Sequence, residues 1–257
     1  MKNCLRKIRY LTHPYLIKRA ILKPFEERES QKHRLRISEY KQYSRSIVDG
    51  IEILMNVNKS DIVKLIRELE DSNFLRYINS CIEQTRGIGG SMDIEYGQLL
   101  YVLVRISKPA VVVETGVANG VSSSFILKAL DDNARGRLYS IDLHYREGVA
   151  VPLGKELGWV IPWELRNRWS LVLGESTRIL PKLLRRLRCI DFFLHDSRHT
   201  YKTMMNEYNI VWPYLRYGGL LLSDDVIEND AFIDFADRVK MHFVVVGRMG
   251  VIKKVAI

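Results

Sequence analysis

The chain has 257 residues, of which 47% are hydrophobic and 27% charged, and this composition excludes a fibrous, low-complexity or wholly disordered protein. No apolar run approaches the roughly 20 residues of a membrane-spanning helix, and the first residues scatter charges where a signal peptide has an apolar stretch. Cys4, Cys81 and Cys189 lie far apart, which supports neither a disulfide framework nor a structural zinc site. We therefore expect a cytoplasmic protein.

The net charge of +10 is concentrated at one end of the chain. Residues 1–45 contain 13 Lys and Arg against 4 Asp and Glu, whereas the rest is close to neutral. This basic arm has three interpretations. It could be a solvated or packed helical face, a segment that contacts an anionic membrane surface, or a segment that binds nucleic acid. Nucleic acid is disfavoured, because no RNA-binding motif or second basic stripe accompanies the arm. A homo-oligomer is compatible with the sequence.

Residues 1–104 are expected to form a helical, basic N-terminal region. Between residues 46 and 85, apolar residues recur at intervals of three and four, which is the spacing of amphipathic helices. A further helix is expected over residues 94–107. We recognise no resemblance to a known family in this region.

From residue 105 to residue 257, strand and helix patterns alternate, which predicts an α/β fold with a doubly wound, mostly parallel sheet. The last two strands follow one another directly, so they predict an antiparallel C-terminal hairpin. The expected strands cover residues 110–114, 137–142, 171–173, 190–194, 219–223, 242–246 and 251–257. The expected helices cover residues 122–130, 200–215 and 229–239, with another that begins at Ser176 or Thr177.

The strongest local signal is the run from Val111 to Ser122, where a buried strand enters a glycine turn that opens a helix. Gly116 and Gly120 let the backbone approach a ligand closely, and the helix N-terminus offers free N–H groups. Glu114 would repel a pyrophosphate, but it suits a ligand with an ammonium group. The alternative is an ordinary strand-to-helix turn with a solvated glutamate.

Asp142 ends the next expected strand, 22 residues after Gly120. A carboxylate at this place can accept both ribose hydroxyls of a nucleoside, although it could also be an ordinary strand-end acid that caps a loop. The glycine turn and the acid together favour a nucleoside-containing ligand. They leave nicotinamide cofactors and S-adenosylmethionine both open.

Acidic residues also end two later strands. Asp196 is followed by His199, and Asp224 and Asp225 stand together at the end of a buried run. The carboxyl ends of parallel strands share one edge of a sheet, so we expect these side chains to face the same crevice. Three carboxylates there would repel one another unless they bound a hard divalent cation, and oxygen ligands favour magnesium. The alternative is that these groups cap helices or pair with nearby cations.

Residues 105–257 resemble the class I S-adenosylmethionine-dependent methyltransferases. The likeness is to the group with a D-x-x-H-x-Y element, which includes metal-dependent sugar and catechol-type O-methyltransferases. That element is residues 196–201 here, and residues 212–219 form the turn that precedes the fifth strand in this fold. His195 and Ser197 depart from the family, in which Ile or Val and Gly are common. The resemblance implies a seven-stranded Rossmann-like sheet.

The resemblance also implies a role for each matched residue. S-adenosylmethionine would be bound by Glu114, Gly116, Gly120 and Ser122 at its methionine end, by Asp142 at the ribose, by Glu175 and Ser176 at the adenine, and by Asp196 between the cofactor and the metal.

The implied reaction is O-methylation of a sugar, a glycolipid or an aromatic small molecule. A cation, Mg²⁺ in this prediction, held by Asp196, Asp224 and Asp225, would lower the pKa of the acceptor hydroxyl, and His199 would then accept the proton because its ordinary pKa is about 6.5. Residues 143–169 are rich in tryptophan, and we expect part of this long segment to form a lid. The alternative is that its tryptophans pack on the sheet edge.

Two rival functions remain at this stage. The first is an inactive methyltransferase-like binding module that uses the basic arm to hold RNA, a membrane surface or a partner. The second is a nicotinamide oxidoreductase, which is weakened by the missing third glycine of the dinucleotide pattern.

Overall fold

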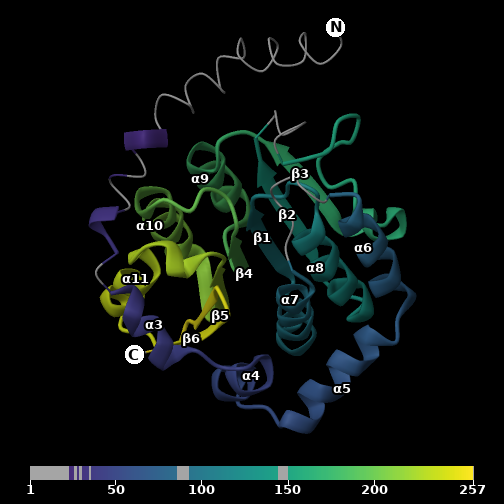
Figure 1. Cartoon of the computed structure of the whole chain (residues 1–257), viewed down its shortest axis with the longest axis horizontal. Coiled ribbons are helices and arrows are strands. Elements are labelled where there is room, and N and C mark those ends of the chain that lie inside the picture. The colour runs from purple at the N-terminus through teal and green to yellow at the C-terminus, as the bar shows by residue number, and fades with distance from the viewer. Residues whose placement is uncertain are drawn as a thin grey trace, which may run out of the picture.

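The computed structural model describes residues 23–25, 28, 31–34, 36–85, 93–143 and 150–256. Its strands are β1 (Val111–Thr115), β2 (Arg137–Asp142), β3 (Trp169–Leu173), β4 (Ile190–His195), β5 (Leu215–Ser223), β6 (Phe243–Val246) and β7 (Met249–Lys253). They form one sheet with the order β3-β2-β1-β4-β5-β7-β6 (Figure 1). β1 to β5 are parallel, and β7 is antiparallel to both β5 and β6. The predicted fold class is confirmed.

Several predicted boundaries are wrong. The fifth strand, expected over residues 219–223 after a turn over residues 212–219, already begins at Leu215, so residues 215–219 belong to β5. The helix expected over residues 200–215 ends at Val211, because the following 3-10 turn contains Pro213, which has no backbone N–H to continue the helix. The last strand, expected over residues 251–257, is instead Met249–Lys253. Its first residue already pairs with the end of β6, so the connecting turn is shorter than the sequence suggested.

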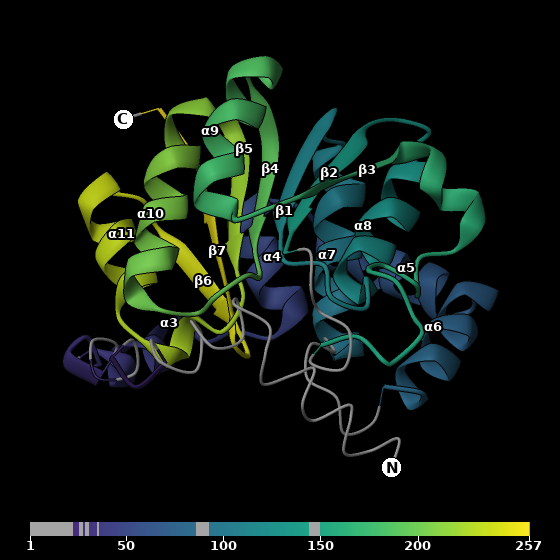
Figure 2. The same cartoon turned by 90° about the horizontal axis from the view of Figure 1, so that it is seen from above.

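Helices cover both faces of the sheet (Figure 2). α4 to α8 bury apolar side chains against one face, and α9 to α11 bury theirs against the other. Successive β1 residues alternate between these two cores, Val112 in the first and Val113 in the second, as the pleat of a strand requires. Among the described residues, every helix is too short or too polar to cross a membrane. The helices are α3 (Tyr40–Tyr43), α4 (Ile47–Met55), α5 (Lys59–Glu70), α6 (Asn73–Glu83), α7 (Ile94–Ser107), α8 (Val121–Asp132), α9 (Ser176–Leu187), α10 (Tyr201–Val211) and α11 (Ala231–Val239).

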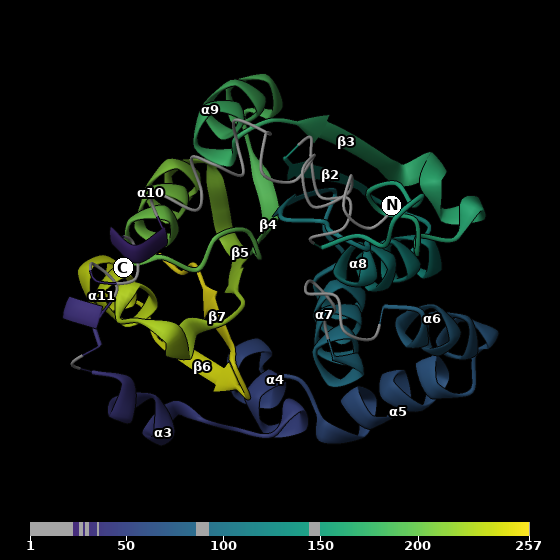
Figure 3. The same ribbon diagram turned by 45° about the horizontal axis from the view of Figure 1, so that its top comes forward.

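The described N-terminal helices share a core with the sheet. Figure 3 shows α4, α5 and α6 following one another around the outside of α7. α7 packs along α8, and Gly97 of α7 lies so close to Phe125 of α8 that an added Cβ would be 2.3 Å from the ring. The expected boundary between residues 104 and 105 therefore falls inside a helix that belongs to this core.

The described part of the basic arm is tied to the C-terminal third of the chain. Arg36 forms ion pairs with Asp234 and Asp237 at 3.3 and 2.6 Å. The hydroxyl of Tyr40, which is 3% exposed, donates to the carbonyl oxygen of Asn229 and accepts from the backbone N–H of Ile233. Arg36 is therefore paired within the protein, and residues 1–22 lie outside the described residues.

We expect Tyr40→Phe to lower the free energy of unfolding by about 1–2 kcal/mol, because two buried hydrogen bonds are lost while the ring remains. Urea denaturation measures this change. Tyr43→Phe is the matched control, since its ring packs on Phe243 while no described residue binds its hydroxyl. Equal effects of the two substitutions would contradict the assignment.

Candidate active site

The turn between β1 and α8 packs directly against the end of β4. Gly116 and Gly120 both have φ of +88°, a conformation that favours glycine. A Cβ on Gly116 would lie 1.8 Å from the carbonyl oxygen of Asp196, and the N–H of Asp196 donates to the carbonyl of Thr115 at 2.8 Å. The two strand ends are thus locked together, and the turn needs glycine for this contact.

Asp142, at the end of β2, holds the same turn. One carboxylate oxygen accepts the backbone N–H groups of Val117 and Ala118, each at 2.8 Å, and the other accepts the N–H of Leu143 at 2.6 Å. The carboxylate is only 3% exposed. It therefore fixes the loop at which a nucleoside ligand was expected, and its contact with a ribose stays a prediction.

Glu114 lies beneath the turn with no exposed surface. Its carboxylate accepts hydrogen bonds from the hydroxyls of Ser122, Ser123 and Ser140 at 2.5, 2.6 and 2.7 Å. Burial raises the pKa of Glu114 to about 7, although the three hydroxyls act in the opposite direction. The glutamate thus holds the first turn of α8 and β2 together, and a direct contact of Glu114 or Ser122 with a ligand stays a prediction.

The described part of the expected lid is packed against the turn. The backbone N–H of Gly158 donates to Ala118 at 3.0 Å, and the indole N–H of Trp159 donates to the side chain of Asn119 at 2.8 Å. A Cβ on Gly120 would lie 2.7 Å from the Cα of Gly158. The part of the segment around Gly158 and Trp159 is therefore fixed against the turn. Residues 144–149 lie outside the described residues.

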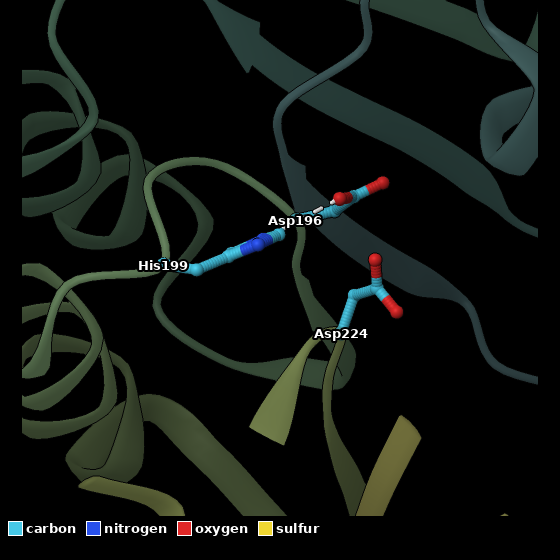
Figure 4. Close-up of side chains that lie close together, drawn as sticks. All are labelled: Asp196, His199 and Asp224. Atoms are coloured by element: carbon cyan, nitrogen blue, oxygen red, sulfur yellow. Dashed lines mark ion pairs between the residues drawn. The ribbon is translucent and has the colours of Figure 1, made fainter. Parts of the chain in front are cut away.

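Asp196, His199 and Asp224 come together where β4 and β5 end (Figure 4). One ligand atom from each of them lies within 4.8 Å of the other two. His199 Nε2 is 3.6 Å from Asp196 Oδ1. His199 Nε2 and Asp224 Oδ1 are buried, and no described residue hydrogen-bonds either atom. Two carboxylates and one imidazole thus converge on a single point.

Asp225 is not part of this group. Its φ of +50° turns the carboxylate toward His199, and Oδ2 lies 2.8 Å from His199 Nδ1. Arg248 pairs with the other oxygen at 2.9 Å. The structure therefore brings together Asp196 and Asp224 of the predicted metal ligands, with His199 at the place expected for Asp225.

The charged groups of this cluster shift one another's pKa values. Burial raises the pKa of Asp224 to about 7, and repulsion from Asp196 and Asp225 adds to the shift. Burial would lower the pKa of His199, but Asp196 and Asp225 outweigh it and raise the pKa to about 10. Without a cation, His199 therefore keeps its proton at neutral pH, whereas the sequence argument assumed an unperturbed pKa.

This arrangement of turn, strand-end acids and sheet order corresponds to a known family. Residues 113–226 match the family model of a methyltransferase domain. Over these residues, which make up less than half of the chain, the protein is similar to a methyltransferase domain. No curated protein sequence matches the chain.

Solved structures with the same fold include several methyltransferases. The O-methyltransferase TomG from Streptomyces achromogenes, solved with S-adenosylmethionine, is 15% identical with a TM-score of 0.55, and the match covers 72% of this chain and 91% of TomG. A methyltransferase from Geobacter sulfurreducens is 21% identical with a TM-score of 0.54, over 78% of this chain and 98% of that one. The O-methyltransferase from Bacillus cereus, solved with S-adenosylhomocysteine, is 12% identical with a TM-score of 0.52, and the match covers 72% of this chain and 92% of that one. The class I methyltransferase fold implied by the resemblance is confirmed.

The predicted adenine-side residues lie at the start of α9. Glu175 is the exposed residue before the helix and pairs with Arg178 at 3.2 Å. Ser176 is the first helical residue, and its hydroxyl donates inward to Glu207. Their contacts with adenine stay predictions, but Ser176 leads to a residue that the sequence analysis missed.

Glu207 of α10 is a buried carboxylate that joins several segments around the site. Oε2 accepts from the hydroxyl of Thr115 at 2.6 Å and lies 2.7 Å from Nδ1 of His195. Oε1 accepts from the hydroxyls of Ser176 and Ser197, the latter at 2.8 Å. Burial would raise the pKa of Glu207, but the charge of His195 and these hydrogen bonds lower it. Glu207 therefore supports the ends of β1 and β4, the segment after β4 and the start of α9.

The protein should lose stability as the pH rises through the titration of Glu114. Because burial raises the folded-state pKa to about 7 from an ordinary 4.5, the folded state binds the proton more tightly, and its stabilisation is complete below about pH 4.5 and is lost by about pH 7. The shift corresponds to about 3 kcal/mol. We expect Glu114→Gln to flatten this part of the curve of unfolding free energy against pH. Glu164→Gln on the exposed surface is the control, and an unchanged curve for Glu114→Gln would contradict the assignment.

Proposed function

We propose that this protein transfers a methyl group from S-adenosylmethionine to a hydroxyl of a small-molecule acceptor, with the help of a divalent cation. The acceptor class is a sugar, a glycolipid or an aromatic molecule. The observation that carries the proposal is the convergence of Asp196, His199 and Asp224 beside the glycine turn of a methyltransferase domain.

The turn and its surroundings support the cofactor assignment. Methyl transfer requires a donor held in line with its acceptor, and a preformed loop reduces the cost of holding it. Here Asp142 fixes the turn through backbone hydrogen bonds, Glu114 fixes the first turn of α8, and Gly116 packs on the end of β4. This rigid loop is the element that would hold S-adenosylmethionine.

The cluster fits a divalent cation on the chemistry of its donors. Asp196 and Asp224 would supply carboxylate oxygens, and Asp224 has a buried oxygen that no described residue satisfies. A buried carboxylate without a partner is costly, and a cation would remove that cost. When bound, a divalent cation lowers the pKa of a hydroxyl that it contacts.

The acceptor hydroxyl must also lose its proton as the methyl group arrives. His199 offers one free nitrogen, Nε2, because Asp225 occupies Nδ1. His199 must first lose its own proton, which the charge of a nearby cation would favour. Nε2 would then either accept the proton of the hydroxyl, as the sequence suggested, or bind the cation, because one lone pair cannot do both. Asp196 is the other predicted catalytic residue, and its carboxylate adjoins His199.

Calorimetric titration of the purified protein with S-adenosylhomocysteine, with and without a divalent cation and with NAD as the control, tests the proposal. We expect S-adenosylhomocysteine to bind at micromolar concentration and NAD not to bind. Binding of NAD alone would support the oxidoreductase instead. Binding of neither would refute the enzyme assignment and favour the inactive binding module.

A further inference from the structure

We infer that His199 is a metal ligand, that Asp225 is the residue that orients it, and that the site takes a first-row transition-metal ion in preference to Mg²⁺. This inference deepens the proposed function and rests on its cation. It assigns the imidazole nitrogen to the ion, whereas the sequence pattern had assigned a third carboxylate.

The free atoms of the cluster define the donor set. Asp224 is 8% exposed, and its Oδ1 is buried with no hydrogen-bond partner among the described residues. His199 Nε2 is likewise buried and without a hydrogen bond, and it belongs with Asp196 and Asp224 to the group within 4.8 Å. Figure 4 shows the three side chains pointing toward one another. Two oxygens and one nitrogen are therefore the atoms available to an ion.

Asp225 and Arg248 hold the imidazole in the orientation that ligation needs. Metal-bound histidines usually donate their second N–H to a carboxylate, which fixes the ring and its tautomer. Asp225 Oδ2 lies 2.8 Å from His199 Nδ1, and Arg248 pairs with Asp225 Oδ1 at 2.9 Å. With Nδ1 bound in this way, the lone pair of Nε2 faces Asp196 and Asp224.

The neighbouring histidine does not compete for this role. His195 is fully buried, and its Nδ1 is bound to Glu207. Its ring lies edge-on to Tyr208, and it is outside the group that could hold an ion. His199 is thus the one imidazole within the described group.

The donor set determines which ions suit the site. Mg²⁺ prefers oxygen ligands, whereas imidazole nitrogen suits first-row transition metals, which also bind a given N/O site more tightly along the series from Mn²⁺ to Cu²⁺. A site with two carboxylates and one imidazole should therefore bind Mn²⁺, the weakest of that series, better than Mg²⁺.

Electron spin-echo spectroscopy of the full chain with Mn²⁺ tests the assignment, because a directly bound imidazole nitrogen modulates the echo. We expect this ¹⁴N modulation in the wild type, its loss in His199→Ala, and its retention in His242→Ala, the exposed control. Protein labelled with ¹⁵N-histidine should change the modulation without any substitution, which keeps the test valid if His199→Ala does not fold. Absence of a histidine signal from the wild type would overturn the inference.

Mn²⁺ titration with Mg²⁺ as competitor measures selectivity. We expect the wild type to bind Mn²⁺ at least about tenfold more tightly than Mg²⁺. Asp225→Ala should weaken Mn²⁺ binding by about 10- to 100-fold, while the ¹⁴N modulation is retained. Equal affinity for both ions, or complete loss of binding in Asp225→Ala with full binding in His199→Ala, would overturn the inference. These readouts need neither cofactor nor turnover, so a failure to bind S-adenosylhomocysteine would count against the proposed function alone.

Discussion

Gly116→Ala should destabilise the protein by roughly 2–4 kcal/mol and weaken the binding of S-adenosylhomocysteine at least about tenfold. The new Cβ would lie 1.8 Å from the carbonyl oxygen of Asp196, and a backbone atom cannot rotate out of the way. Either the turn or the end of β4 must move, and both belong to the site. Urea denaturation and calorimetric titration measure the two effects.

Gly218→Ala is the matched control for this substitution. Gly218 has a φ of +80°, close to that of Gly116, but nothing lies within 4 Å of the Cβ position. It should therefore show only the backbone cost of about 1 kcal/mol, with cofactor binding intact. Equal losses in the two variants would mean that the contact with Asp196 is unimportant.

Removal of Glu207 should have the largest effect on stability. We expect Glu207→Ala to lower the free energy of unfolding by about 3–5 kcal/mol, because it leaves His195 and the hydroxyls of Thr115, Ser176 and Ser197 without their shared acceptor in a buried place. Chemical denaturation at neutral pH measures the loss.

Two controls separate the lost contacts from a general effect of substitution. Glu207→Gln keeps the shape and one acceptor oxygen, so it should cost less than Glu207→Ala. Glu228→Ala removes a half-exposed glutamate paired with Arg34 at 3.3 Å, and it should cost less than about 1 kcal/mol. A Glu207→Ala variant as stable as Glu228→Ala would refute the role of Glu207.

The sheet and the strand-end acids could be predicted because both follow from short-range patterns. A buried run that ends in an acid marks a strand and its carboxyl end, and parallel strands bring such ends to one edge. Asp196 and Asp224 accordingly meet, although they are far apart in sequence. Asp142 was likewise placed next to the glycine turn.

The remaining features depend on tertiary packing that no local pattern records. Asp224 and Asp225 are equivalent in the sequence, and only the left-handed backbone at Asp225 turns one of them away from the cluster. Glu207 occupies an ordinary position in an expected helix, where a solvated side chain is the default. Backbone hydrogen bonds from Gly158 and Val160 hold the segment after β2 against the glycine turn. Such bonds depend on the path of the chain and not on residue type.

The core and the sheet include residues that lie outside the range matched by the family model. The family match ends at residue 226, before β7, which lies between β5 and β6, and it begins after α7, whose Gly97 admits the ring of Phe125. A chain trimmed to the shared residues would therefore expose a bare edge on β5 and an uncovered face on α8. Any replacement of the N-terminal helices would therefore have to reproduce the surface of α7 that fits α8.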